Sequence, residues 1–230
     1  MGRKKNKPQY DAKKIMNEIV TEVSDLFISE KMSLRELSRE FDMSVGKITK
    51  LLITAGAYHT DVSDEVLFWK TEGLSVDEIS NKMGIKRTAV NGYLPYSKIP
   101  YNAKEISQNA ERIAKYRKRK QAVVSLQEDM SADKLWTALM EFQGYQFLTY
   151  RGLKFSYYIK GGELFVDRKA ESKTITRSSV NMAFENAIKI MQADGFVKGP
   201  KKLGTFGASY LYPIFIRFGI IVDTVSQCSM

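Results

Sequence analysis

Hydrophobic and polar positions follow the same order twice in the first hundred residues, 42 positions apart. The stretches 33–52 and 75–94 each begin with a serine and carry a glutamate three residues later. This spacing is a capping box, so each stretch predicts a helix that begins just after its serine. A polar break and a second helical pattern follow in both stretches. The matching apolar positions are Leu34/Val76, Leu37/Ile79, Phe41/Met83, Met43/Ile85, Ile48/Val90, Leu51/Tyr93 and Leu52/Leu94.

A further helix is predicted in front of each pair. Residues 11–30 have an apolar stripe at helical spacing, and residues 62–71 form the corresponding helix of the second repeat. The last helices of the two repeats are expected at 45–54 and 86–93. Gly84 lies at the turn of the second repeat, where a left-handed backbone costs glycine little.

Over residues 11–97 this pattern of caps, turns and apolar positions resembles the helix-turn-helix superfamily, particularly the small three-helix units of sigma-factor-like and transposon-encoded regulators. The resemblance implies two tandem units, 11–58 and 59–97, in which the last helix of each unit reads base edges in the major groove of DNA. The outward positions that it implies are Ser44, Gly46, Lys47, Thr49 and Lys50 in the first unit, and Lys86, Arg87, Thr88, Asn91 and Gly92 in the second.

Two of these side chains are the sharpest candidates for reading a base. Arginine bonds guanine through two hydrogen bonds and asparagine does the same with adenine, which singles out Arg87 and Asn91. The lysines could serve bases or phosphates, and phosphate contacts position a protein without specifying a sequence. Gly46 weakens the reading helix of the first unit, so we expect the second unit to be the better reader. The alternative is that one unit of the pair is structural or binds protein.

Charge supports a polyanionic partner. The chain has 36 Lys+Arg against 26 Asp+Glu, a formal net charge of +10. Residues 1–10 are a basic tail, and residues 98–130 are predicted to be a linker and a helix that contains the basic run 115–120. Lys118 and Arg119 are candidates for contacts along the DNA backbone, where each cation would displace condensed counterions. The alternative is a solvated, charged helix end.

The composition of the chain changes at residue 131, after which aromatic residues and glycines become frequent. The pattern predicts a helix, a three-stranded antiparallel sheet, a helix, a loop and a final helix. The fold class is therefore α+β, with an all-α tandem helix-turn-helix region followed by a small α/β module. The expected strands are 145–150, 153–159 and 163–168.

The sequence of the module does not favour an enzyme. Asp167, Arg168 and Lys169 resemble the acid-x-Lys element of metal-dependent nucleases, but no aspartate or glutamate lies between Phe142 and Gly162 to supply a second metal ligand. The remaining histidine and cysteine chemistry is equally sparse, because the chain has one of each, His59 and Cys228. We expect no catalytic residue, no metal and no cofactor.

The resulting hypothesis is sequence-specific binding of double-stranded DNA, in transcriptional regulation. The module 131–230 would support dimerisation, effector recognition or further DNA contact. Two alternatives stay open: a mobile-element or defence protein whose module acts on DNA, and an inhibitor or adaptor whose module binds another protein. Without an apolar signal or a membrane-length apolar run, we expect a cytoplasmic, nucleoid-associated protein and no membrane partner.

Overall fold

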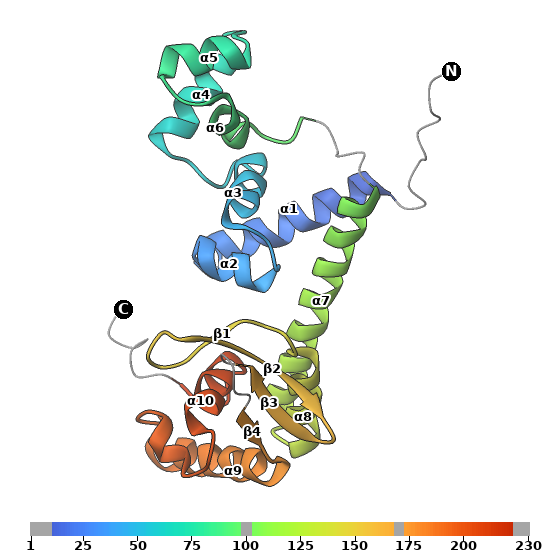
Figure 1. Cartoon of the computed structure of the whole chain (residues 1–230), viewed down its shortest axis with the longest axis vertical. Coiled ribbons are helices and arrows are strands. Elements are labelled where there is room, and N and C mark those ends of the chain that lie inside the picture. The colour runs from blue at the N-terminus through green and yellow to red at the C-terminus, as the bar shows by residue number, and fades with distance from the viewer. Residues whose placement is uncertain (1–10, 98–102, 168–172, 223–230) are drawn as a thin grey trace. The chain divides into compact units, whose positions relative to one another are not determined.

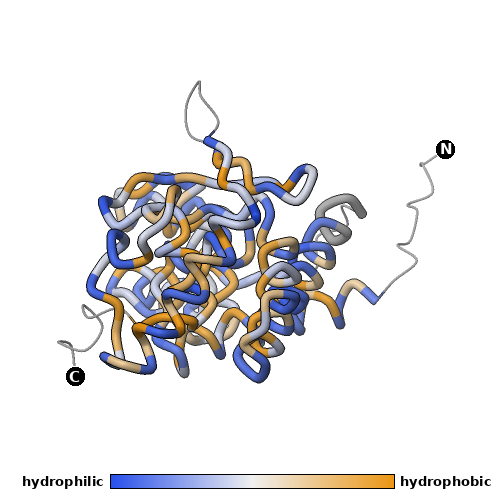
Figure 2. Tube along the Cα trace, turned by 90° about the horizontal axis from the view of Figure 1, so that it is seen from below, coloured by the Kyte–Doolittle hydropathy of each residue, from blue (hydrophilic) through white to orange (hydrophobic). Residues whose placement is uncertain are grey.

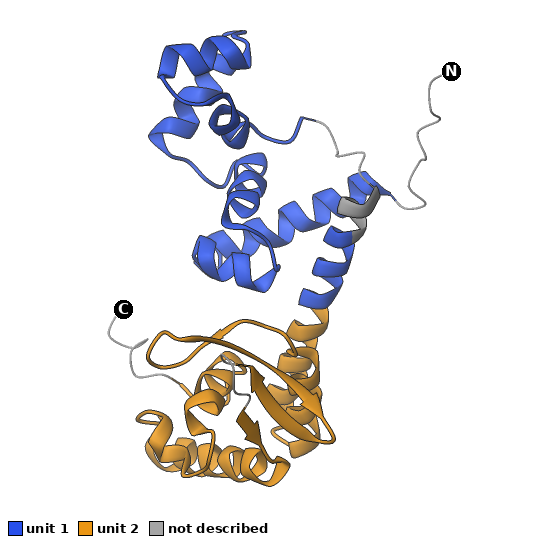
Figure 3. Ribbon diagram, in the orientation of Figure 1, with its two compact units in different colours: residues 1–116 blue, residues 117–230 orange. Residues whose placement is uncertain are grey.

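The computed structural model describes residues 11–97, 103–167 and 173–222, with side chains in the second range described from residue 108 onward. Two compact units divide the chain, residues 1–116 and 117–230, shown in blue and orange in Figure 3. The α+β fold class is confirmed: helices make up the first unit, and the second combines helices with a small antiparallel sheet.

The first unit contains the tandem helix-turn-helix repeats and the beginning of a long helix (Figure 1). Its helices are α1 (Ala12–Ile28), α2 (Leu34–Glu40), α3 (Val45–Thr54), α4 (Asp61–Thr71), α5 (Val76–Met83), α6 (Arg87–Tyr93) and the first part of α7 (Ala103–Glu128). The repeats differ in their cores. The first repeat shares its core with α7, where the Tyr116 ring stacks on Phe41 at a centroid distance of 4.8 Å. The second repeat has a smaller core around Val66, Ile79 and Val90.

Both predicted capping boxes are present. Ser33 caps α2 and Ser75 caps α5, and each hydroxyl accepts a hydrogen bond from the glutamate backbone N–H three residues later. In return the carboxylates of Glu36 and Glu78 accept from the serine backbone N–H groups, at 2.8 and 2.7 Å. Two donors that a helix start leaves unpaired are thus satisfied in each repeat. The predicted starts of both helices are confirmed.

The turns of the two repeats are held by a second pair of serines, which the sequence pattern did not single out. Ser80 donates its hydroxyl to the Ile85 carbonyl at 2.6 Å, across the turn between α5 and α6. Ser38 makes the same bond to the Met43 carbonyl, between α2 and α3. The 42-residue spacing therefore holds for individual hydrogen bonds. Positions 42 apart are called repeat partners below.

Repeat partners also share unusual backbone conformations. Asp42 and its partner Gly84 are both left-handed, with φ of 51° and 65°. Lys31 and its partner Gly73 follow the same rule, with φ of 52° and 89°. Among the described residues, Lys31 and Asp42 are the two non-glycine residues with positive φ. The first repeat thus places side chains at two positions where glycine would be free of strain.

The second unit packs helices around a four-stranded sheet. Its helices are the rest of α7, α8 (Ala132–Glu141), α9 (Arg177–Asp194), the short 3₁₀ helix η1 (Pro200–Leu203) and α10 (Ala208–Arg217). Its strands are β1 (Phe147–Leu148), β2 (Lys154–Lys160), β3 (Glu163–Asp167) and β4 (Lys173–Ile175), antiparallel in the order β1-β2-β3-β4. Two buried tyrosines secure this core, because the hydroxyl of Tyr157 donates to the Leu139 carbonyl and that of Tyr212 to the Val197 carbonyl.

The sheet differs from the three predicted strands. The strand β4 was not anticipated, because a run of three residues is too short to show alternation; pairing with β3 in the register Leu164↔Ile175 orders it. Helix α7 continues to Glu128, close to the end of the predicted stretch 98–130, and Leu126 near its end is buried in the second unit's core. The predicted final helix is present as α10, which ends at Arg217.

Candidate nucleic-acid interface

Helix α6 presents its polar side to solvent. Val90 is completely buried and Tyr93 packs against the small core of the second repeat. Helical spacing then turns the intervening positions outward. The residues that the sequence assigned to this face are all exposed: Lys86, which precedes the helix as its N-cap, and Arg87, Thr88, Asn91 and Gly92. The structure therefore brings the candidate residues of the second repeat together on one short helix.

Arg87 is paired within the protein across the helix-turn-helix. Its Nη1 lies 3.0 Å from Oδ1 of Asp77 on α5, and both side chains remain about two-thirds exposed, at 65% and 63%. An exposed ion pair of this kind contributes little net free energy because water screens it. The guanidinium can therefore exchange Asp77 for another acceptor at small cost, while the carboxylate keeps it near the start of α6.

The cations of α3 are arranged differently from the expected outward face. Ser44 and Gly46 are exposed, but Lys47, Thr49 and Lys50 are half-buried. Lys47 donates from Nζ to Oδ1 of Asn109 on α7 at 3.1 Å. Lys50 donates to a backbone carbonyl of α6 at 2.8 Å, and burial lowers the pKa of its ammonium group. The expectation that these lysines face outward is thus corrected, because α3 packs against neighbours on both sides.

On the basic helix, two adjacent candidates have different environments. Lys118 is exposed. Arg119 is only 3% exposed, and its guanidinium carbon lies 5.0 Å from the Tyr145 ring centroid and 5.6 Å from that of Phe142. The expected surface position of Arg119 is therefore corrected. The sequence contains a pattern that could have predicted this burial. Arg119 stands at helical spacing from the apolar residues 116, 122, 123 and 126, so it lies on the same side of α7 as they do.

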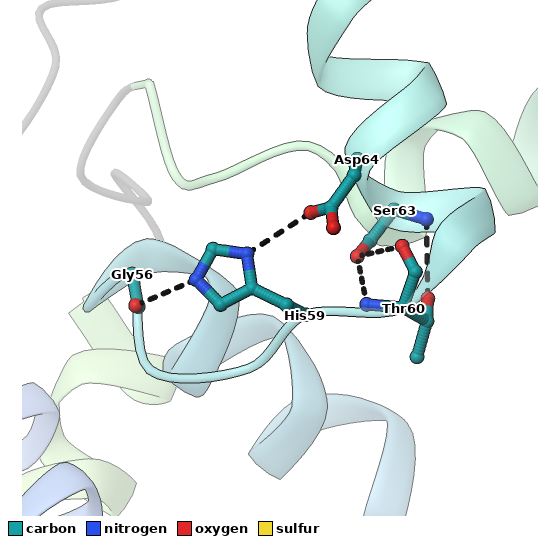
Figure 4. Close-up of polar contacts among 5 residues, drawn as sticks. All are labelled: Gly56, His59, Thr60, Ser63 and Asp64. Atoms are coloured by element: carbon teal, nitrogen blue, oxygen red, sulfur yellow. Dashed lines mark hydrogen bonds and ion pairs between the residues drawn. The ribbon is translucent and has the colours of Figure 1, made fainter.

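His59 lies in the connector between the repeats and bonds to residues on either side of it (Figure 4). Nδ1 lies 3.0 Å from Oδ1 of Asp64 on α4, and Nε2 lies 3.0 Å from the Gly56 carbonyl oxygen. A neutral imidazole has one N–H, so both bonds to acceptors form together only in the imidazolium state. The Asp64 carboxylate and the Gly56 carbonyl accordingly raise the pKa of His59. Thr60 and Ser63 add a reciprocal cap at the start of α4.

The other chemical features of the sequence gather no site among the described residues. Asp167 is exposed at the end of β3, while Arg168 and Lys169, like the basic tail 1–10, lie outside the described residues. Within the described ranges, no three His, Cys, Asp or Glu side chains form a group that could hold a metal ion. Figure 2 shows hydrophilic and hydrophobic residues interspersed along the trace, and none of the described helices is long and apolar enough to cross a membrane.

Comparison of the chain with protein-family models, with curated proteins and with solved structures finds no match in any of the three. The relevant features are the exposed face of α6, the Arg87–Asp77 pair beside it and the internally bonded lysines of α3.

Proposed function

We propose that this protein binds double-stranded DNA in a sequence-specific manner and acts as a transcriptional regulator, with α6 as the reading helix. The observation that supports the proposal most is the outward face of α6, where Lys86, Arg87, Thr88 and Asn91 are all exposed on the second helix of a helix-turn-helix unit. This is the element that such units insert into the major groove.

The dimensions and chemistry of α6 suit that role. A helix of seven residues is about 10 Å long, and the major groove, about 12 Å wide, admits a helix. Arg87 and Asn91 are four positions apart, so they lie on the same side of α6. One can address guanine and the other adenine, while Lys86 at the N-cap position can neutralise a phosphate.

The test is selection of bound duplexes from random sequence, followed by binding measurements on single variants of the full chain. Asn91→Ala should relax preference at one base pair by about 1–3 kcal/mol, and Arg87→Ala at another. Asn81→Ala is the matched control, because Asn81 is exposed on α5, outside the reading face. Wild-type protein that binds all duplexes equally well would refute sequence reading.

The Arg87–Asp77 ion pair allows a second test, in which the variant should bind DNA more tightly rather than more weakly. Asp77→Asn removes the partner of Arg87 together with a negative charge beside the DNA. If Arg87 contacts DNA, this variant should bind the selected duplex several-fold more tightly, and most clearly at low salt. Asp77→Asn combined with Arg87→Ala should lose that gain. Equal gains with and without Arg87 would show that only net charge matters.

In this proposal the module 131–230, which lies within the second unit, supports dimerisation, effector recognition or further DNA contact, and the protein resides with the nucleoid. The second unit is the more basic part of the chain: residues 117–230 hold 17 Lys+Arg and 10 Asp+Glu, against 19 and 16 in residues 1–116. A net charge of +7 against +3 favours DNA contact by both units. Footprinting of the complex with the full chain would map each contribution.

A further inference from the structure

Lys50 joins the two repeats. From α3 its Nζ donates to the backbone carbonyl oxygen of Asn91 at 2.8 Å, and the same ammonium lies 4.8 Å from the centroid of the Tyr96 ring. A nearby bond follows the same path, since the backbone N–H of Tyr96 donates to Oγ1 of Thr54 at 3.1 Å. These contacts are called the α3–α6 seam.

The carbonyl that Lys50 binds has a specific need for a donor. In a continuing helix the Asn91 carbonyl would accept from the N–H of the residue four positions later. That residue is Pro95, which has no N–H. Helix α6 ends at Tyr93, and Leu94 already has an extended backbone with ψ of 141°. The ammonium of Lys50 therefore supplies a donor that the chain beyond α6 lacks.

The repeat partners of the α3 lysines show that this arrangement belongs to one repeat only. The partner of Lys50 is Gly92, and the partner of Lys47 is Ala89. Gly92 is exposed, and a Cβ added there would meet nothing within 4 Å. The first repeat thus has long cations that bond within the protein, whereas the second has small residues that leave the outer face of α6 uncovered.

We propose that Lys50 is a positioning residue for DNA reading: by holding the Asn91 carbonyl, it fixes how α6 is turned and where the Asn91 side chain points, without contacting DNA itself. This inference rests on the proposed function of α6. It changes the role of α3 from a second reading helix to the support on which α6 is mounted.

Salt dependence separates positioning from phosphate contact. Log affinity falls linearly with log salt, and each phosphate that a protein neutralises makes this fall steeper by about 0.9; the slope below is the magnitude of this fall. In the full chain, Lys50→Met keeps the length of the side chain and removes the donor and the charge. It should weaken binding to the selected duplex about tenfold at every salt concentration, with an unchanged slope. Lys86→Met, the control on the exposed face, should lower the slope by about 0.9.

A lower slope for Lys50→Met, or unchanged affinity and base preference, would overturn the proposal. Hydrogen exchange of the DNA-free protein supplies an independent measurement. In Lys50→Met, amides 90–94 should exchange about tenfold faster than in the wild type, while amides 79–83 of α5 should not change. Lys50→Arg, which keeps a donor, should restore most of the protection if the seam acts through this bond.

The two proposals can fail separately. Wild-type protein without duplex preference would remove the proposed function, whereas unchanged exchange at 90–94 in Lys50→Met would remove the seam as a support for α6. Uniformly faster exchange throughout 12–97 would indicate general loss of folding, and it too would contradict a role confined to α6.

Discussion

At the scale of single residues, the two repeats adopt the same backbone conformation with different residues. The left-handed position at the helix-turn-helix turn is occupied by Asp42 in one repeat and by Gly84 in the other. A side chain there strains the backbone by about 1–2 kcal/mol, which aspartate tolerates better than most residues. The sequence made Gly84 recognisable as a turn, but the conformation of Asp42 became predictable only through its repeat partner.

Two glycine substitutions should consequently have opposite effects on the free energy of unfolding. Gly84→Ala should lower the free energy of unfolding by about 1 kcal/mol, because φ is positive, although a Cβ would meet nothing within 4 Å. Gly46→Ala, in the first turn of α3 and equally uncrowded, should raise it by up to about 0.8 kcal/mol through helix propensity. Urea denaturation of both variants checks the pair, and equal signs would contradict the conformational explanation.

The His59 bonds predict a pH-dependent contribution to stability. The folded-state pKa is raised above 6.5, so the contribution is fully present below the unfolded pKa and is lost as pH rises through the folded value. His59→Gln should therefore destabilise the first unit at about pH 5.5 and have little effect at about pH 9. Denaturation of both proteins across this range measures the difference. Asp64→Asn should abolish most of the pH dependence, and a gap that widens with rising pH would contradict the sign.

At the scale of helices and strands, local signals made the first unit predictable. Serine, glutamate and glycine act within a few residues, so the starts of α2 and α5 could be read from the chain. The environment of a side chain that contacts distant parts of the chain could not be read in this way. Lys50 meets a carbonyl 41 positions away and Lys47 an amide 62 positions away, so their half-buried positions depend on how helices pack. Strand β4 depends in the same way on pairing with β3.

Cap removal tests the helix starts. Ser75→Ala should cost about 1 kcal/mol of unfolding free energy, since the Glu78 backbone N–H loses its acceptor, and Ser33→Ala should cost a similar amount in the first repeat. Thermal and urea denaturation measure both. Ser209→Ala is the control, because that exposed serine lies inside α10 and its hydroxyl caps no helix. A loss as large in the control as in Ser75→Ala would assign the effect to something other than capping.

At the scale of the whole molecule, each unit has its own core. Phe41, completely buried, stacks on Tyr116 in the first unit, and the second unit's core begins with residues of α7 from Ala122 onward. Phe41→Ala should remove about 3–5 kcal/mol from the first unit and leave the second unit's unfolding midpoint almost unchanged. Hydrogen exchange in increasing denaturant resolves the units, and an equal loss in both would show a single cooperative unit.

Under the proposed function, the internal bonding of the α3 lysines limits how much DNA sequence one copy of the protein can recognise. With α6 as its sole reading helix, a copy would address roughly three to five base pairs, as other short recognition helices do. A word of that size occurs by chance on the order of a thousand times or more even at the lower end of the about 10⁶–10⁹ competing positions that a genome offers. Natural targets should therefore be composite, with two such words at fixed spacing or one word flanked by a region read through its shape.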